Sequence, residues 1–181
     1  YGSLRFKADM SHVIEHSQSF VGNDGLEVVN NKGQLSTGIF DNRAAGSVSW
    51  RKDNWRVRWS TRFKSSVVDD HDRVEDFQER FADNQLLIDA GDPDAILNPE
   101  VPLYLFYGSY TTHNLSASYK WEIDNKGTDL RLSGGINNVF DDQGPFVPNT
   151  GDNVESGRGN FDSEYGGGTG RFVYIGAELT F

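Results

Sequence analysis

The sequence predicts an all-β fold, an antiparallel transmembrane β-barrel segment of about six strands with long extracellular loops and short periplasmic turns. Three observations support this prediction. Apolar and polar residues alternate with period 2 in six segments of the chain. The connections between these segments are alternately short and long, and three tryptophans stand beside the short ones. Each observation is typical of strands that cross a membrane with one face toward lipid.

The composition is compatible with such strands. The 181 residues suit one domain, 36% of them are hydrophobic, and the mean hydropathy is −0.60. No run of 18 or more apolar residues occurs, which excludes a transmembrane helix. Barrel strands alternate lipid-facing and lumen-facing residues, so their average hydropathy is low. The aromatic content of 13% and the 20 glycines favour strands and turns over helices.

The sequence indicates no enzyme, cofactor or metal chemistry. The chain has no cysteine, and its net charge of −10 argues against a nucleic-acid partner. His12 and His16 fall in an extended pattern, so they would not share a helix face suited to a metal. The acidic groups at 69–72 and 89–94 lack the EF-hand spacing and are interpreted as solvated loops. Neither a P-loop nor a Gly-x-Ser-x-Gly elbow is present.

The alternating segments define two faces. They cover residues 3–15, about 43–51, 55–67, about 111–123, about 129–140 and 172–181. In the clearest of them, residues 55–67, Trp55, Val57 and Trp59 alternate with arginines. In a barrel the apolar set would face lipid and the charged set the lumen. The residues predicted to face the lumen are Arg56, Arg58, Arg62, Lys64 and Arg131.

The connections give the predicted topology. Residues 16–42, 68–110 and 141–170 are long, polar and rich in Asp, Asn and Gly, whereas residues 52–54 and 124–127 form short turns. Long loops without structure of their own are uncommon in compact soluble domains. In outer-membrane barrels, long loops on the extracellular side and short turns on the periplasmic side are the rule. The first, third and fifth strands would therefore run outward.

Tryptophans mark one end of the predicted strands. Trp50, Trp55 and Trp121 lie next to the two short turns and fall on the apolar face by parity. An aromatic girdle at the membrane–water interface predicts both positions. Core tryptophans in a β-sandwich would also lie on the apolar face, and that interpretation remains open.

The C-terminal part of the chain carries a recognisable motif. Residues 135–142, Gly-Ile-Asn-Asn-Val-Phe-Asp-Asp, resemble the penultimate-strand signature of TonB-dependent receptors, typically Gly-Val-Asn-Asn-Leu-Phe-Asp followed by a proline. Here Pro145 comes slightly later than usual, and Asn114 stands where Asp is commoner in a similar upstream strand entry. The resemblance covers about residues 109–181. The motif residues are Asn137, Asn138, Val139, Phe140 and Asp141.

The last strand resembles the assembly signal of outer-membrane barrels, a terminal aromatic residue preceded by apolar residues at every second position. The residues in question are Val173, Ile175, Ala177, Leu179 and Phe181. The assembly machinery that reads this signal is therefore an expected partner.

The resemblance implies a 22-stranded barrel filled by an N-terminal plug. Residues 1–181 are then expected to be a partial C-terminal barrel without the plug, because about six strands cannot enclose one. The implied function is active uptake of a scarce solute, a siderophore, cobalamin or an oligosaccharide, across the outer membrane of a Gram-negative bacterium. The implied partners are outer-membrane lipid, the remaining strands and plug, TonB through the plug, and the solute.

Two other functions remain open. A secreted carbohydrate-binding β-sandwich would also have aromatic strands and acidic loops, and a passive porin-like channel would differ only in lacking a plug. Residues 103–110 are strongly aromatic and could stack on a sugar or an aromatic solute, or could simply form the outer part of the fourth strand. The candidate ligand contacts are Tyr104, Phe106, Tyr107 and Tyr110.

Overall fold

The computed structural model describes residues 1–22, 25–99, 105–123, 127–147 and 170–181. Its main element is a six-stranded antiparallel sheet with the strand order β1-β4-β5-β8-β9-β10. The expectation of a chain built mostly from antiparallel strands is therefore confirmed. The strands are β1 (Ser3–His12), β4 (Asn42–Lys52), β5 (Trp55–Lys64), β8 (Tyr110–Glu122), β9 (Asp129–Asn137) and β10 (Phe172–Thr180).

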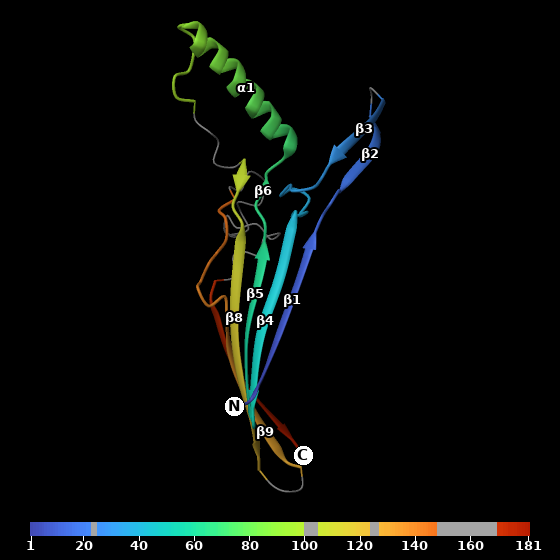
Figure 1. Cartoon of the computed structure of the whole chain (residues 1–181), viewed down its shortest axis with the longest axis vertical. Helices are drawn as coiled ribbons and strands as arrows, with labels where there is room; N and C mark the ends of the chain where they lie inside the picture. The colour runs from blue at the N-terminus through green and yellow to red at the C-terminus, as the bar shows by residue number, and fades with distance from the viewer. Residues whose placement is uncertain (23–24, 100–104, 124–126, 148–169) are drawn as a thin grey trace, which may run out of the picture.

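These strands form a simple meander in which each pairs with the next strand of the sheet along the chain. The described parts of the long connections gather at one end of the sheet, and the turn between β4 and β5 and both termini lie toward the other (Figure 1). The turn between β4 and β5 contains only Asp53 and Asn54, and Asp53 has a φ of 50°. Asp tolerates this left-handed conformation better than most residues, which suits it to a two-residue hairpin turn.

The long connections contain structure that the sequence analysis did not predict. Residues 16–42 include a hairpin of β2 (Ser17–Gly22) and β3 (Gly25–Asn30). Residues 68–110 include the helix α1 (His71–Ala90), which projects from the end of the sheet (Figure 1). The short strands β6 (Val67–Val68) and β7 (Phe106–Tyr107) pair at the base of this helix. The prediction of unstructured loops is wrong for both connections, and most of the third lies outside the described residues.

The ends of α1 are set by local chemistry. Asp70 is the N-cap, and its carboxylate accepts a hydrogen bond from the Asp72 amide at 2.9 Å. Gly91 ends the helix at a φ of 67°, in the left-handed conformation that favours glycine. Asp70 therefore belongs to a helix terminus and not to a solvated loop.

Asp70→Ala is expected to destabilise the first turn of α1 by about 1 kcal/mol, because the Asp72 amide loses its acceptor. Hydrogen exchange of the first-turn amides should then become about fivefold faster. Glu75→Ala is the control, since Glu75 is exposed in the same helix and alanine is an excellent helix former. Equal exchange rates in the two variants would contradict a capping role for Asp70.

A small hydrophobic core lies where the long connections meet the sheet. It consists of Leu35, Phe40, Val67, Tyr107 and Tyr110, with Val147 packed against it. Phe40 is only 1% exposed, and its ring is flanked by the Arg43 guanidinium at 5.2 Å and the Lys64 ammonium at 5.1 Å. The core thus fixes the connections to one end of the sheet.

The rest of the sheet is a single layer. β1 and β10 each pair with one neighbouring strand, and within the described ranges the sheet is not closed into a barrel. In that same part of the chain, no helix combines the length and the apolar character needed to cross a membrane.

Candidate functional site

The two faces of the sheet differ sharply in chemistry. Cross-strand partners in an antiparallel sheet point to the same face, so the register assigns each residue to one side. One row of partners is Leu4, Trp50, Val57, Ala117, Gly134 and Ile175. The next is Phe6, Val48, Trp59, Leu115, Ile136 and Val173. An apolar face therefore runs without interruption across all six strands.

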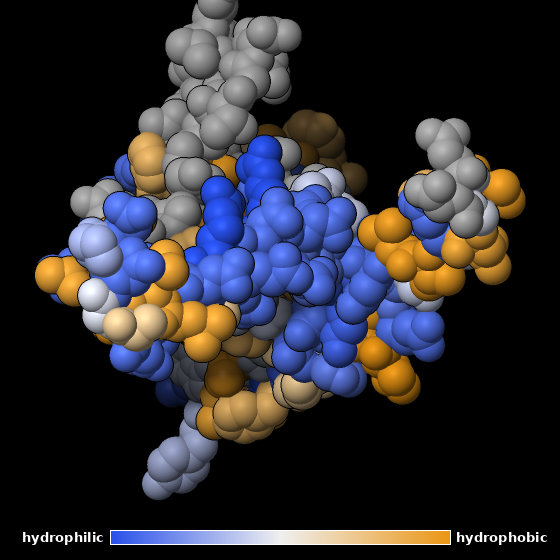
Figure 2. Space-filling view, turned by 90° about the horizontal axis from the view of Figure 1, so that it is seen from above, coloured by the Kyte–Doolittle hydropathy of each residue, from blue (hydrophilic) through white to orange (hydrophobic). Residues whose placement is uncertain are grey.

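This apolar face is strongly exposed. Phe6 is 71% exposed, Leu132 46% and Ile175 91%. Seen from the end that carries the long connections, hydrophilic residues occupy the middle of the view and hydrophobic residues gather mainly toward its margin (Figure 2). The residues of the expected assembly signal, namely Val173, Ile175, Ala177, Leu179 and Phe181, all fall in the exposed part of the chain.

Aromatic residues stand at the short-turn end of the apolar face. Trp50 and Trp55 flank the turn between β4 and β5, and Trp121 precedes the turn between β8 and β9. The Trp55 ring lies 4.8 Å from the ring of Tyr119, its cross-strand partner. Trp55 and Trp121 are about half exposed, at 49% and 59%. The structure thus places all three predicted girdle residues at one end of one face.

A second aromatic group lies farther along the same face. The His113 ring is 5.1 Å from Phe140, and Trp59 is 6.1 Å from Phe140. Thr61 lies 2.9 Å from the His113 Nδ1 and accepts a hydrogen bond from the Trp59 indole at 3.2 Å. The indole and imidazole groups are therefore hydrogen-bonded on a face that is mostly apolar.

The opposite face is polar and strongly basic. The register places Arg56, Arg58, Arg62, Lys64 and Arg131 on it together, as the alternation predicts. Most of these cations lie toward the short turns. We use the name cationic strip for Arg5, Arg51, Arg56, Arg58 and Arg131, which come from β1, β4, β5 and β9.

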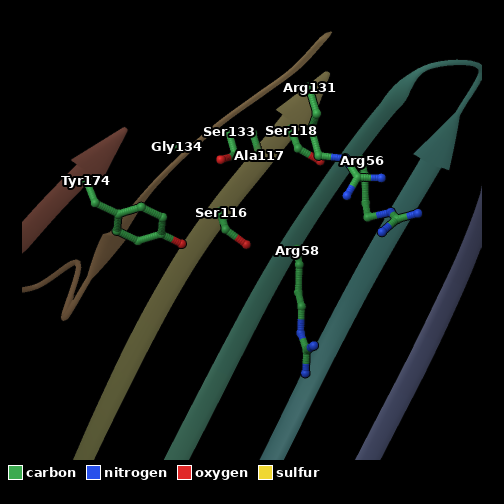
Figure 3. Close-up of a pocket in the computed structure, with 9 residues that line it drawn as sticks. All are labelled: Arg56, Arg58, Ser116, Ala117, Ser118, Arg131, Ser133, Gly134 and Tyr174. Carbon is green, nitrogen blue, oxygen red and sulfur yellow. The ribbon is translucent and has the colours of Figure 1, made fainter. Parts of the chain in front are cut away.

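The cationic strip borders a shallow depression of about 290 Å³ on the polar face. Arg56 and Arg131 approach each other at one end of it, and the ring of Tyr174 lies at the other (Figure 3). The hydroxyl groups of Ser116, Ser118 and Ser133 line the depression between them. A smaller depression beside it is lined by Arg51, Arg56, Lys120 and Arg131, together with Asp53.

The Tyr174 ring is held in place by a glycine. Gly135 is the cross-strand partner of Tyr174, and a Cβ at Gly135 would lie only 2.6 Å from the tyrosine hydroxyl oxygen. The ring therefore lies over the glycine and carries its hydroxyl toward Ser116 (Figure 3). This contact was not predicted, although a tyrosine that faces a glycine across two strands is a signal for it.

Few carboxylates neutralise the cationic strip. Arg131 pairs with Glu178 at 3.5 Å, and the neighbouring Lys120 pairs with Asp129 at 2.7 Å. Arg5, Arg51, Arg56 and Arg58 form no ion pair with any residue that the structure describes. Arg51 and Arg56 even face each other directly across β4 and β5. The sequence analysis did not single out Arg51, but the two-residue turn fixes this pairing.

The Asn-Asn-Val-Phe-Asp motif folds into a clasp after β9. Asn138, at a φ of 52° and 6% exposed, donates a side-chain hydrogen bond to the Asp142 carbonyl at 2.7 Å and accepts one from the Asp142 amide at 3.1 Å. Val139 donates its amide hydrogen to the His113 carbonyl at 2.8 Å. Asp141 accepts the Arg171 amide hydrogen at 2.6 Å, which ties the clasp to the start of β10. These contacts give the motif a structural role. Its first residue, Asn137, is the last residue of β9.

The aromatic candidates for ligand contact do not form one exposed group. Tyr107 and Tyr110 are 4% and 6% exposed and belong to the small hydrophobic core where the long connections meet the sheet. The Tyr110 hydroxyl donates a hydrogen bond to the Asp142 carbonyl at 2.8 Å, so it supports the clasp. Phe106 is exposed at 49%, and Tyr104 lies outside the described residues. Phe106 and Tyr107 form β7, which is separate from β8, so this segment is not the outer part of the fourth strand.

Comparison of the chain with protein-family models, with curated proteins and with solved structures found no match. The two faces of the sheet are therefore the basis for the functional proposal.

Proposed function

We propose that this chain is part of a TonB-dependent outer-membrane receptor, with the apolar face toward lipid and the polar face toward the lumen of a barrel. The observation that carries the proposal is the exposed apolar face, which is continuous across all six strands. On this proposal the protein resides in the outer membrane of a Gram-negative bacterium. It takes up a scarce solute there by active transport.

The strand dimensions support this proposal. A strand that crosses a bilayer at a tilt needs about 9–11 residues. β4, β5 and β8 have 11, 10 and 13 residues, and β9 and β10 have 9 each. Trp55 and Phe63 stand eight residues apart on the apolar face, a span of about 26 Å at the usual rise of a strand. At a tilt of about 40° this span projects to about 20 Å along the membrane normal, which is most of the roughly 25 Å height of the apolar band of outer-membrane barrels.

The edges of the sheet also favour a barrel. β1 and β10 are the outer strands of the sheet, so each has one edge that pairs with no other strand among the described residues. In lipid, each unsatisfied backbone group on such an edge costs several kcal/mol. Further strands that pair with both edges would remove this cost and close the wall. The TonB-dependent receptor is preferred among barrels because of the motif at 137–141.

A secreted β-sandwich that binds carbohydrate is the second candidate. Such a fold buries the apolar face of one sheet against a second sheet about 10 Å away. Over the residues that the structure describes, no second sheet covers the apolar face of the six strands, which is why the barrel is preferred. A passive porin-like channel would have the same two faces. It would conduct ions through a planar bilayer without energy input, which distinguishes it from a plugged receptor.

The proposal predicts that lipid quenches the fluorescence of the protein. All four tryptophans, Trp50, Trp55, Trp59 and Trp121, occupy positions on the apolar face. In vesicles of phospholipids with brominated acyl chains, we expect strong quenching, because bromine must contact the indole ring to act. Trp59, near the middle of β5, should respond best to bromine deep in the chains. Trp55 and Trp121 should respond best to bromine near the headgroups.

Single-tryptophan variants provide the controls, with the other three residues changed to phenylalanine. Iodide in the aqueous phase should quench Trp59 poorly. Efficient quenching of every tryptophan by iodide, with no response to brominated lipid, would reject the lipid-facing assignment and favour the sandwich.

A further inference from the structure

Charge is segregated along this chain. Residues 13–41, 65–109 and 138–171, which form the long connections, contain 21 Asp and Glu against 5 Lys and Arg. The remaining residues, the six strands and the short turns, contain 6 Asp and Glu against 12 Lys and Arg. A protein with a net charge of −10 therefore has a basic sheet below acidic connections.

The cationic strip concentrates this positive charge. Arg51 and Arg56 are direct cross-strand partners, and so are Lys120 and Arg131. Like charges placed directly opposite each other destabilise a sheet. The four side chains nevertheless line one small depression together with Asp53. Lys120 and Arg131 each pair with a carboxylate, whereas Arg51 and Arg56 form no ion pair with any residue that the structure describes. An anion bound there would relieve the repulsion.

We propose that the cationic strip is a docking surface for an acidic polypeptide segment. The guanidinium groups of Arg56 and Arg58 would bind carboxylates of the segment, because the planar donors of arginine match a carboxylate with two parallel hydrogen bonds. The hydroxyls of Ser116 and Ser118 and the ring of Tyr174 would contact its backbone and shorter side chains. All five arginines of the strip are exposed and so accessible to such a segment.

The length of the strip points to a polypeptide and not to a small anion. Its arginines extend from β1 to β9, which spans four inter-strand spacings in the sheet order and so about 19 Å. A single carboxylate or phosphate would reach only two or three of them. A polypeptide with several spaced carboxylates can satisfy the whole strip at once.

This inference concerns the polar face alone and does not depend on whether the opposite face contacts lipid. The test uses the full chain in an uncharged detergent. The probe is a fluorescein-labelled peptide of six Glu-Ser-Gly repeats, and fluorescence anisotropy measures its binding. We expect saturable binding that weakens as salt is raised. Any binding of the matching peptide of Lys-Ser-Gly repeats would be to the acidic connections and should not change when arginines of the strip are substituted.

Two variants locate the binding. The double variant Arg56→Gln, Arg58→Gln removes two of the exposed ion pairs expected between the strip and the peptide. We expect this variant to bind the peptide about tenfold more weakly. Arg62→Gln is the matched control, because Arg62 lies on the same strand and the same face but lines neither depression. The control should change the dissociation constant less than about twofold.

Three outcomes would overturn the proposal. The first is the absence of binding of the acidic peptide at low salt. The second is an equal loss of binding free energy per charge removed in the double variant and in Arg62→Gln, which would indicate diffuse attraction without a defined surface. The third is complete displacement of the peptide by inorganic phosphate that supplies the same concentration of negative charge as the peptide. This would show that the strip binds small anions.

Discussion

Leu132→Arg is expected, on the proposed lipid-facing arrangement, to destabilise the protein in a membrane by roughly 2–4 kcal/mol, as charged residues do near the midplane on the lipid face of a barrel. Leu132 lies in the middle of β9, with Tyr119 and Ala177 as its cross-strand partners on the apolar face. A guanidinium at this position would have to enter the hydrocarbon region or distort the strand. The change would be measured as the free energy of unfolding in urea from lipid vesicles.

The polar face provides the control for this prediction. Ser60 lies in the middle of β5 between Ser47 and Asn114, and an arginine there can remain solvated. Ser60→Arg should therefore change the free energy of unfolding by no more than about 0.5 kcal/mol. If the two variants lose equal stability, the assignment of the faces to lipid and lumen is wrong.

Asn138→Ala should cost about 3 kcal/mol, because it removes two hydrogen bonds to the Asp142 backbone and leaves alanine in the left-handed conformation. Asn138 is nearly fully buried, so water cannot replace the lost partners. The loss would release the clasp between β9 and β10, through Asp141 and its bond to Arg171. Urea unfolding in vesicles gives the total cost, and hydrogen exchange of the β9 and β10 amides shows where the structure opens.

Asn138→Gly separates the two causes. Glycine adopts a φ of 52° without strain but cannot make the side-chain hydrogen bonds, so about 2 kcal/mol of the loss should remain. An alanine variant as stable as the wild type would show that the clasp does not contribute to stability. It would also remove the structural explanation for the Asn-Asn-Val-Phe-Asp motif.

Strand positions and faces could be predicted from the sequence because both follow from a local period of two. The short turn at Asp53 and Asn54 leaves one register for β4 and β5, so the positions of Trp50 and Trp55 could be predicted with it. Several predicted strands extend too far. The first ends at His12 and not at residue 15, and the third ends at Lys64 and not at residue 67. The first ends where the chain leaves the sheet toward the β2–β3 hairpin, and the third ends just before Val67 of the hydrophobic core, which alternation cannot show.

The contents of the long connections were predicted poorly for a different reason. Val74, Phe77 and Phe81 have helical spacing in α1, but they stand among many acidic residues, and the stretch also resembles a polar loop. Tyr107 and Tyr110 look like exposed aromatic residues in the sequence. Their burial depends on Leu35 and Phe40, which are distant in the chain. Such contacts are decided by packing between segments and have no local pattern.

By itself, the sequence determined an antiparallel sheet with one apolar face and one basic face, because side-chain direction in a strand depends only on parity. Only the tertiary structure decided that α1 and the β2–β3 hairpin occupy the connections, and that Asn138 closes a clasp. It also brought Arg51, Arg56, Lys120 and Arg131 around one depression. Those features arise where separate strands and loops meet, and their geometry depends on contacts between residues far apart in the chain.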